Sequence, residues 1–171
     1  MKTKEIILDA TIKLMKSHKA NKLTVQKILD EANVSRSTFY SFFSDKYDVI
    51  NYYFEHYFDS RNENVRNSCA YQFLYDNKDY FINAFDIEDQ NSFKKFFYDH
   101  YYKECSQIYL ANMNKESLSN DEKIELEFYC MGALHIAKQW LMNGAKESPE
   151  HMAELTQKLI PEKYWKYFSK R

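Results

Sequence analysis

The scarcity of glycine and proline limits what this chain can fold into more than any other feature of its sequence. Only 2 Gly and 2 Pro occur among its 171 residues. A β-rich fold needs many tight turns, and these two residue types supply the backbone conformations that such turns require. The length is sufficient for one or two small domains with a substantial buried core. The sequence therefore predicts an all-α protein.

The spacing of apolar residues places the expected helices along the chain. They cover residues 4–19 and 25–31, a short stretch after Ser35, a long stretch from Asp45, and then 66–76, 78–85, 91–112, 121–143 and 149–159, with a last turn at 164–168. Thr24, Ser35 and Ser44 are expected to cap three of these helices, and Ser148 to cap the helix that starts with Pro149. Residues 128–137 are apolar on nearly every face, which predicts a helix buried on both sides.

Residues 25–43 have the pattern of a helix-turn-helix motif. Two short helices are joined by a tight turn, in which Asn33 stands where a left-handed residue is needed. In such motifs the second helix enters the major groove of DNA and contacts bases through its amino-terminal residues. Arg36 can bind guanine bidentately, whereas Thr38 and Tyr40 carry hydroxyls suited to phosphate oxygens.

The surroundings of this motif agree with a surface that faces phosphate. Phe39 and Phe43 lie one turn apart and are expected to point inward, while Lys46 adds a cation near the DNA backbone. Residues 1–47 carry nine Lys and Arg against five Asp and Glu, a net +4 in a chain whose total is −1. A basic module is typical of nucleic-acid binding. An excess of this size also arises by chance.

Each outward side chain has a second, structural interpretation. Ser35 caps a helix whatever the function of that helix. Arg36, Lys46 and Gln26 are also compatible with a solvated surface, and Tyr40 with a half-buried position in a core. The residues alone therefore leave both interpretations open.

Residues 23–54, LTVQKILDEANVSRSTFYSFFSDKYDVINYYF, resemble the DNA-binding domain of the TetR family of bacterial transcription regulators. The match in order and spacing runs through Leu23-Thr24-Val25, Ile28, Ala32, Val34-Ser35, Thr38-Phe39-Tyr40, Phe43 and Lys46. With the two helix caps included, the resemblance implies these DNA-binding residues: Thr24, Gln26, Ser35, Arg36, Ser37, Thr38, Tyr40, Ser41 and Lys46. The sequence departs from the family at Asn33, where Gly is usual, and at Phe42, where His is frequent.

The resemblance also implies how the chain is organised. The family is an all-α homodimer, with a helix-turn-helix domain expected over residues 1–47 and a helical dimerisation and ligand-binding domain over 48–171. Residues 132–161 are loosely similar to the last two helices of a subgroup that includes activators of dihydroxyacetone-kinase operons. Apolar and small residues on these two helices predict the dimer interface: Gly132, Ile136, Trp140, Leu141, Met152, Leu155 and Leu159.

A ligand pocket is a further expectation for the second domain. Aromatic residues make up 18% of the chain, and several gather on the helices expected at 91–112 and 121–143. A cavity lined by them would suit a small apolar or aromatic effector. The expected lining residues are Phe93, Phe97, Tyr101, Cys105, Phe128, Met131 and His135. A plain packed core is the alternative, and a compositional bias toward aromatic residues is the alternative for their number.

Several classes of protein are disfavoured by the sequence. Cys69, Cys105 and Cys130 lie far apart, so neither a disulfide framework nor a zinc site is expected. We find no nucleophile elbow, phosphate-binding glycine loop or metalloprotease motif, so we expect no catalytic residue, no metal and no cofactor. No apolar run has the length of a signal core or a membrane span, so a cytoplasmic protein with no membrane partner is expected.

The sequence thus predicts a DNA-binding transcription regulator that is not an enzyme. Its expected partners are double-stranded DNA, a second copy of itself and a small effector. A ligand-responsive repressor that binds a palindromic operator as a homodimer is the family default. The alternative is a protein-binding module that acts through a partner subunit and binds little DNA by itself.

Overall fold

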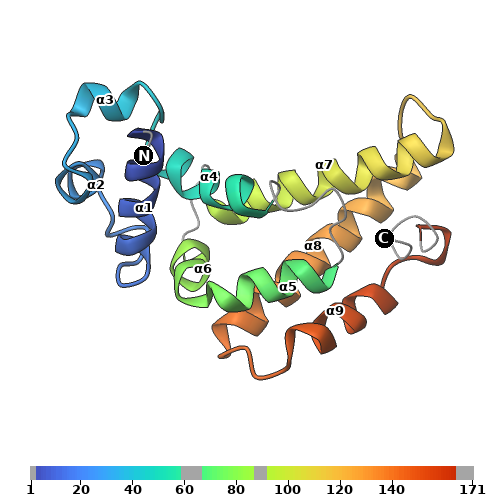
Figure 1. Ribbon diagram of the computed structural model, residues 1–171. Coiled ribbons are helices and arrows are strands. Elements are labelled where there is room, and N and C mark those ends of the chain that lie inside the picture. Colours follow the sequence, from blue (N-terminus) through green and yellow to red (C-terminus); the bar gives the residue numbers. More distant parts are fainter. Residues whose placement is uncertain (1–2, 59–66, 87–91, 165–171) are drawn as a thin grey trace. The chain divides into compact units, whose positions relative to one another are not determined.

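The computed structural model describes residues 3–58, 67–86 and 92–164, and within these ranges the regular structure is entirely helical (Figure 1). The helices are α1 Thr3–Met15, α2 Val25–Ala32, α3 Arg36–Tyr40, α4 Lys46–Phe58, α5 Asn67–Asp76, α6 Lys78–Phe85, α7 Phe93–Met113, α8 Asn120–Met142 and α9 Pro149–Lys158. The predicted all-α fold is confirmed. Of the last turn predicted at 164–168, residues 165–168 lie outside the described part of the chain.

The chain forms two compact units, and each unit combines two stretches that are separate in the sequence. The first unit combines Met1–Glu63 with Asn77–Lys95, and the second combines Asn64–Asp76 with Phe96–Arg171. Helix α6 therefore belongs with α1 to α4, whereas α5 belongs with α8 and α9. The boundary at residue 47 stays a prediction about where the DNA-binding part ends.

Side-chain caps fix three helix starts where the sequence predicted them, those of α2, α3 and α9. The Thr24 side chain accepts a hydrogen bond from the Lys27 backbone N–H at 3.2 Å, and Ser35 accepts one from Thr38 at 3.1 Å. Ser148 caps α9, which begins with a proline. The helices at 78–85, 121–143 and 149–159 match their predicted bounds within a residue or two. Helix α1 ends at Met15, earlier than the predicted residue 19.

The cap predicted for the fourth helix was wrong. Helix α4 begins at Lys46, and its first backbone N–H groups, those of Tyr47 and Asp48, donate to Asp45 Oδ1 at 2.7 and 2.8 Å. Ser44 instead donates from its N–H and its hydroxyl to Asp48 Oδ2. A carboxylate at a helix amino terminus is favoured by the helix dipole as well as by hydrogen bonds, so Asp45 takes the position predicted for the serine.

Packed aromatic rings form the part of the first unit that lies between α4, α6 and the start of α7. Tyr53 and Tyr80 lie 4.5 Å apart between ring centroids, and Phe81 and Phe93 lie 5.3 Å apart. The Tyr80 hydroxyl is buried and donates to the Ile50 carbonyl at 2.9 Å, which satisfies its polar atom. These contacts give α4 a fixed support on one side.

The second unit is built around α5, which packs along α9 and contacts α8 (Figure 1). Tyr71 of α5 meets the Trp140 ring of α8 edge-on, at 5.3 Å between centroids. The Trp140 N–H donates to the Glu147 carbonyl at 3.1 Å, which ties the α8–α9 connection to this core. Another buried cluster joins α7, α8 and the end of the described chain: Cys105, Tyr109, Leu126, Tyr129, Cys130, Ile160 and Tyr164.

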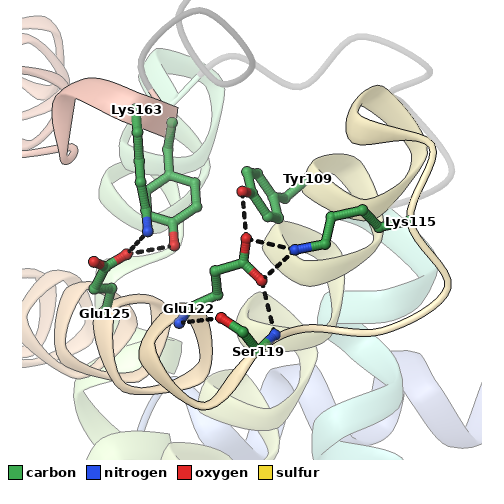
Figure 2. Close-up of polar contacts among 7 residues, drawn as sticks. Tyr109, Lys115, Ser119, Glu122, Glu125 and Lys163 are labelled. Atoms are coloured by element: carbon green, nitrogen blue, oxygen red, sulfur yellow. Dashed lines mark hydrogen bonds and ion pairs between the residues drawn. The ribbon is translucent and has the colours of Figure 1, made fainter.

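A buried carboxylate organises the connection between α7 and α8 (Figure 2). Glu122 is only 8% exposed and accepts hydrogen bonds from the Lys115 ammonium at 2.7 Å and the Tyr109 hydroxyl at 2.6 Å. It also accepts from the Ser119 N–H and so completes a capping box at the start of α8. These donors, Lys115 first, lower the Glu122 pKa to about 2. Nearby, Glu125 accepts from the Tyr164 hydroxyl at 2.7 Å.

We expect Glu122→Gln to lower the stability of the protein in a pH-dependent way. The folded-state pKa of about 2 lies below the ordinary 4.5, so the carboxylate stabilises the fold above pH 4.5 and loses this contribution as the pH falls toward 2. The gap in urea midpoint between wild type and variant should therefore be large at neutral pH and smaller near about pH 3. Glu116→Gln, in the same connection but exposed, is the control and should show no gap. A Glu122→Gln gap of equal size at both pH values would contradict this role.

Candidate nucleic-acid interface

A left-handed residue and two buried phenylalanines hold α2 and α3 in a helix-turn-helix arrangement. Asn33 has φ 52° and ψ 47°, and its N–H donates to the Leu29 carbonyl at the end of α2. Phe39 is fully buried and Phe43 is 2% exposed, with 5.9 Å between their ring centroids. The predicted turn and the inward direction of both phenylalanines are confirmed.

The opposite side of α3 presents polar side chains to the surroundings. Arg36, Ser37 and Ser41 are exposed, Thr38 is half-buried, and Tyr40 is 49% exposed. The half-buried core position considered for Tyr40 is therefore wrong. On α2, Gln26 and its neighbouring cap Thr24 are also exposed. The residues predicted to contact DNA thus lie at accessible positions, while the contacts themselves stay predictions.

Hydroxyl groups cluster at the start of α3. The Ser35 hydroxyl lies 2.9 Å from the Ser37 hydroxyl and 2.7 Å from that of Thr38. Ser41 donates from its hydroxyl to the Thr38 carbonyl at 2.7 Å. Each hydroxyl oxygen has lone pairs and a rotatable proton, so these groups can exchange their mutual bonds for bonds to phosphate. Phe42, which stands where the family frequently has His, is 41% exposed and offers only an apolar surface.

A chain of hydrogen bonds links α2 to the arginine of α3. Gln26 donates from Nε2 to Asp30 Oδ1 at 2.8 Å, and its Oε1 accepts from Arg36 Nη2 at 2.8 Å. Gln26 and Arg36 were each predicted from the sequence, whereas Asp30 was not among the predicted residues. The spacing of Gln26 and Asp30 by four residues was a signal for their contact, but no sequence pattern links either one to Arg36.

Lys46 has structural partners that the sequence did not predict. Its ammonium donates to the backbone carbonyls of Ala20 and Leu23, both at 2.9 Å, and lies 4.9 Å from the centre of the Tyr47 ring. These bonds fasten the start of α4 to the connection between α1 and α2. A phosphate contact by Lys46 stays a prediction. The two hydrogen bonds to backbone carbonyls give the side chain a structural role in addition.

Of the residues predicted to line a pocket, only Tyr101 and Cys105 lie together in the buried cluster of α7 and α8. Phe93 packs against Phe85 in the first unit, with 4.9 Å between ring centroids, whereas the other predicted residues belong to the second unit. Within the second unit Cys105 is buried, but Phe128 is 82% and Met131 47% exposed. Phe97 is buried, Tyr101 half-buried and His135 exposed. The outward residues lie on the face of α8 opposite its buried stripe, so they do not line the interior of the unit.

Some of the residues predicted for the dimer interface are buried within the chain, and others are exposed. Trp140, Leu141 and Met152 are buried inside the chain, and Ile136 is half-buried. Gly132, Leu155 and Leu159 are exposed, and a Cβ added at Gly132 would meet no atom within 4 Å. We call the exposed apolar and small residues of these helices the outer α8–α9 set: Ile124, Phe128, Met131, Gly132, Met142, Leu155 and Leu159. Ile124 and Met142 were missed, although they continue the helical spacing of Phe128 and Met131.

The residues that the structure describes contain no group of three or more His, Cys, Asp or Glu side chains placed to hold a metal ion. None of the helices in the described ranges has both the length and the apolar character needed to cross a membrane.

Comparisons with known proteins agree with this geometry. Residues 7–53 match the sequence profile of "Bacterial regulatory proteins, tetR family", and residues 68–162 match the profile of "Transcriptional regulator C-terminal region". Among solved structures, the chain is similar to "Dihydroxyacetone kinase operon activator DhaS", with 21% identity, a TM-score of 0.65 and coverage of 92% of this chain and 93% of that one. At this identity the likeness concerns the fold. No protein of curated function matches the chain.

We expect Lys46→Met to destabilise the helix-turn-helix motif. Methionine keeps most of the unbranched apolar side chain but leaves the carbonyls of Ala20 and Leu23 without the ammonium, which should cost about 1–3 kcal/mol of unfolding free energy. Urea unfolding measures this loss, with Lys22→Met, an exposed lysine of the same connection, as the control. Unchanged stability of Lys46→Met, together with weaker DNA binding, would instead assign the residue to phosphate contact alone.

Proposed function

The chain belongs to the tetR family of bacterial regulatory proteins, and from this premise we propose that it regulates transcription by binding a palindromic DNA operator as a homodimer. The observation that carries DNA binding is the two-sided character of α3. Phe39 is buried on its inner side and Phe43 is buried just after its end, while Arg36 and Tyr40 stand exposed on its outer side. A helix held in this way can enter a major groove without losing its own support.

The outer α8–α9 set supports a homodimer. Leu126, Tyr129, Cys130 and Leu134 form the buried stripe of α8, so the exposed Phe128 and Met131 face away from the core of their own chain. Large exposed apolar side chains in a regular helical row are typical of a protein interface. A second copy is the occupant that we propose, because residues 128–137 are apolar on nearly all faces and the profile match over 68–162 is to a regulator's carboxy-terminal region. Gly132 would let a partner helix approach closely.

Such a dimer determines the geometry of the operator. A two-fold interface is isologous, so the two copies of α3 are related by the same axis. Successive major grooves on one side of B-DNA are separated by about 34–36 Å, and each copy of α3 would occupy one of them. The operator is therefore proposed to be a palindrome with half-sites one helical turn apart.

The sign of regulation has two candidates. Repression that a small ligand relieves is the family default. Activation is the second candidate, because the similar solved structure is described as the activator of a dihydroxyacetone kinase operon. For the effector, the cluster that contains the buried Cys105, Tyr129 and Cys130, with the half-buried Tyr101 packed against it, is the part of the second unit with suitable apolar and aromatic character. The family and the fold point to regulation rather than catalysis.

Binding of the purified protein to its own upstream promoter duplex tests the proposed function. Selective binding is expected, with affinity falling by more than about tenfold between about 50 and 200 mM salt, because phosphate contacts release counterions. A scrambled duplex of the same composition is the control. Equal and weak binding to both duplexes would reject operator binding and favour the alternative, a module that acts through a partner subunit.

We expect Phe128→Asp to weaken the dimer without harming the fold of the chain. The Phe128 ring is 82% exposed, so its replacement leaves the core intact but puts a charge at the proposed interface twice, once from each copy. The dimer dissociation constant from analytical ultracentrifugation should rise by at least about tenfold. Gln107→Asp adds the same charge to an exposed position of α7 and is the matched control. An unchanged dimer would place the interface elsewhere.

A further inference from the structure

The hydrogen-bonded chain Asp30–Gln26–Arg36 suggests how base preference is set. We propose that Asp30 and Gln26 are positioning residues that hold the Arg36 guanidinium ready for a guanine, rather than contacts that read DNA themselves. The proposal rests on the DNA-binding function proposed above and deepens it. It gives α2 a share in the specificity of α3 and assigns a role to Asp30, an acidic residue close to the expected DNA surface.

The chemistry of the three groups allows only one orientation of the central amide. Nε2 of Gln26 donates to the Asp30 carboxylate, and a carboxylate can only accept. Arg36 can only donate, so the Gln26 oxygen must face it, as it does at 2.8 Å. Turning the amide over would set oxygen against carboxylate and NH₂ against guanidinium. Asp30 and Arg36 therefore select the same orientation of the Gln26 amide.

A fixed Gln26 oxygen restricts an arginine that would otherwise sample many conformations. Arg36 is exposed, and an exposed arginine loses rotamer freedom when it binds a base. The bond to Gln26 removes part of that freedom before DNA arrives. It uses one Nη2 donor and leaves other N–H groups of the guanidinium for the O6 and N7 atoms of guanine.

The Gln26 amide, which lies between the Asp30 carboxylate and the Arg36 guanidinium, also keeps the guanidinium available for guanine. A carboxylate in direct contact with Arg36 would occupy the two-pronged edge of the guanidinium that binds guanine. The Gln26 side chain keeps the Asp30 carboxylate one residue away and passes on orientation through a single bond. The expected cost of Asp30 is weaker attraction to phosphate on every duplex, so the arrangement exchanges overall affinity for selectivity.

Two substitutions of Asp30 separate orientation from charge. Asp30→Asn and Asp30→Ala remove the same negative charge, but only asparagine keeps an oxygen that can accept from Gln26. Enrichment of binding sites from a random duplex pool measures base preference at each position, and titration of single duplexes measures overall affinity. Both variants should bind all duplexes more tightly. Asp30→Ala alone should lose roughly three- to tenfold of the preference for guanine, the size expected for one hydrogen bond.

A second set of variants distinguishes positioning from direct reading by Gln26. Gln26→Ala should lower the guanine preference in the wild-type background and have no effect on it when Arg36→Ala is already present. Additive losses would mean that Gln26 reads DNA independently and would overturn the proposal. Equal preference in Asp30→Ala and Asp30→Asn would overturn it as well. In both cases the wild type still binds selectively, whereas a wild type without selectivity would reject the proposed function itself.

Discussion

Burial of Phe39 and Phe43 is the interaction on which the candidate DNA surface depends. Helix α3 has only five residues, and a helix of that length is not stable by itself in water because its nucleation is costly. The Phe39 ring fixes one side of it in the core, the Phe43 ring anchors the chain just after its end, and the Ser35 cap satisfies a backbone N–H group at its start. The outward residues can then be chosen for contact with DNA instead of for helix stability.

Single charged side chains fix the connections around these helices in both units. Lys46 draws two backbone carbonyls toward the start of α4, and Glu122 draws an ammonium, a hydroxyl and a backbone N–H toward the start of α8. A chain with so few glycines and prolines has little turn chemistry of its own. Charge-assisted hydrogen bonds, which are stronger than neutral ones, define the connections in its place.

Features that depend on neighbours in sequence could be predicted, and features that depend on facing elements could not. The caps Thr24, Ser35 and Ser148 and the left-handed Asn33 are local and were found where expected. The direction of Phe128 was not found, because a helix apolar on nearly all faces gives no periodic signal for its inner side. The Gln26–Arg36 contact joins residues that are ten positions apart and lie on different helices, so no sequence pattern predicts it.

The charge on the candidate DNA surface explains why the placement of one arginine can matter. Within α3, Arg36 is the one charged residue, and its neighbours there offer neutral hydroxyls and the rings of Phe39 and Tyr40. Attraction to phosphate then comes from lysines elsewhere in a part of the chain with net charge +4, and it acts on every duplex alike. Discrimination between duplexes must arise from the few groups that reach base edges. A bidentate arginine adds most to base discrimination when its guanidinium is already oriented, and in the proposal above the bond that Arg36 donates to Gln26 supplies this orientation.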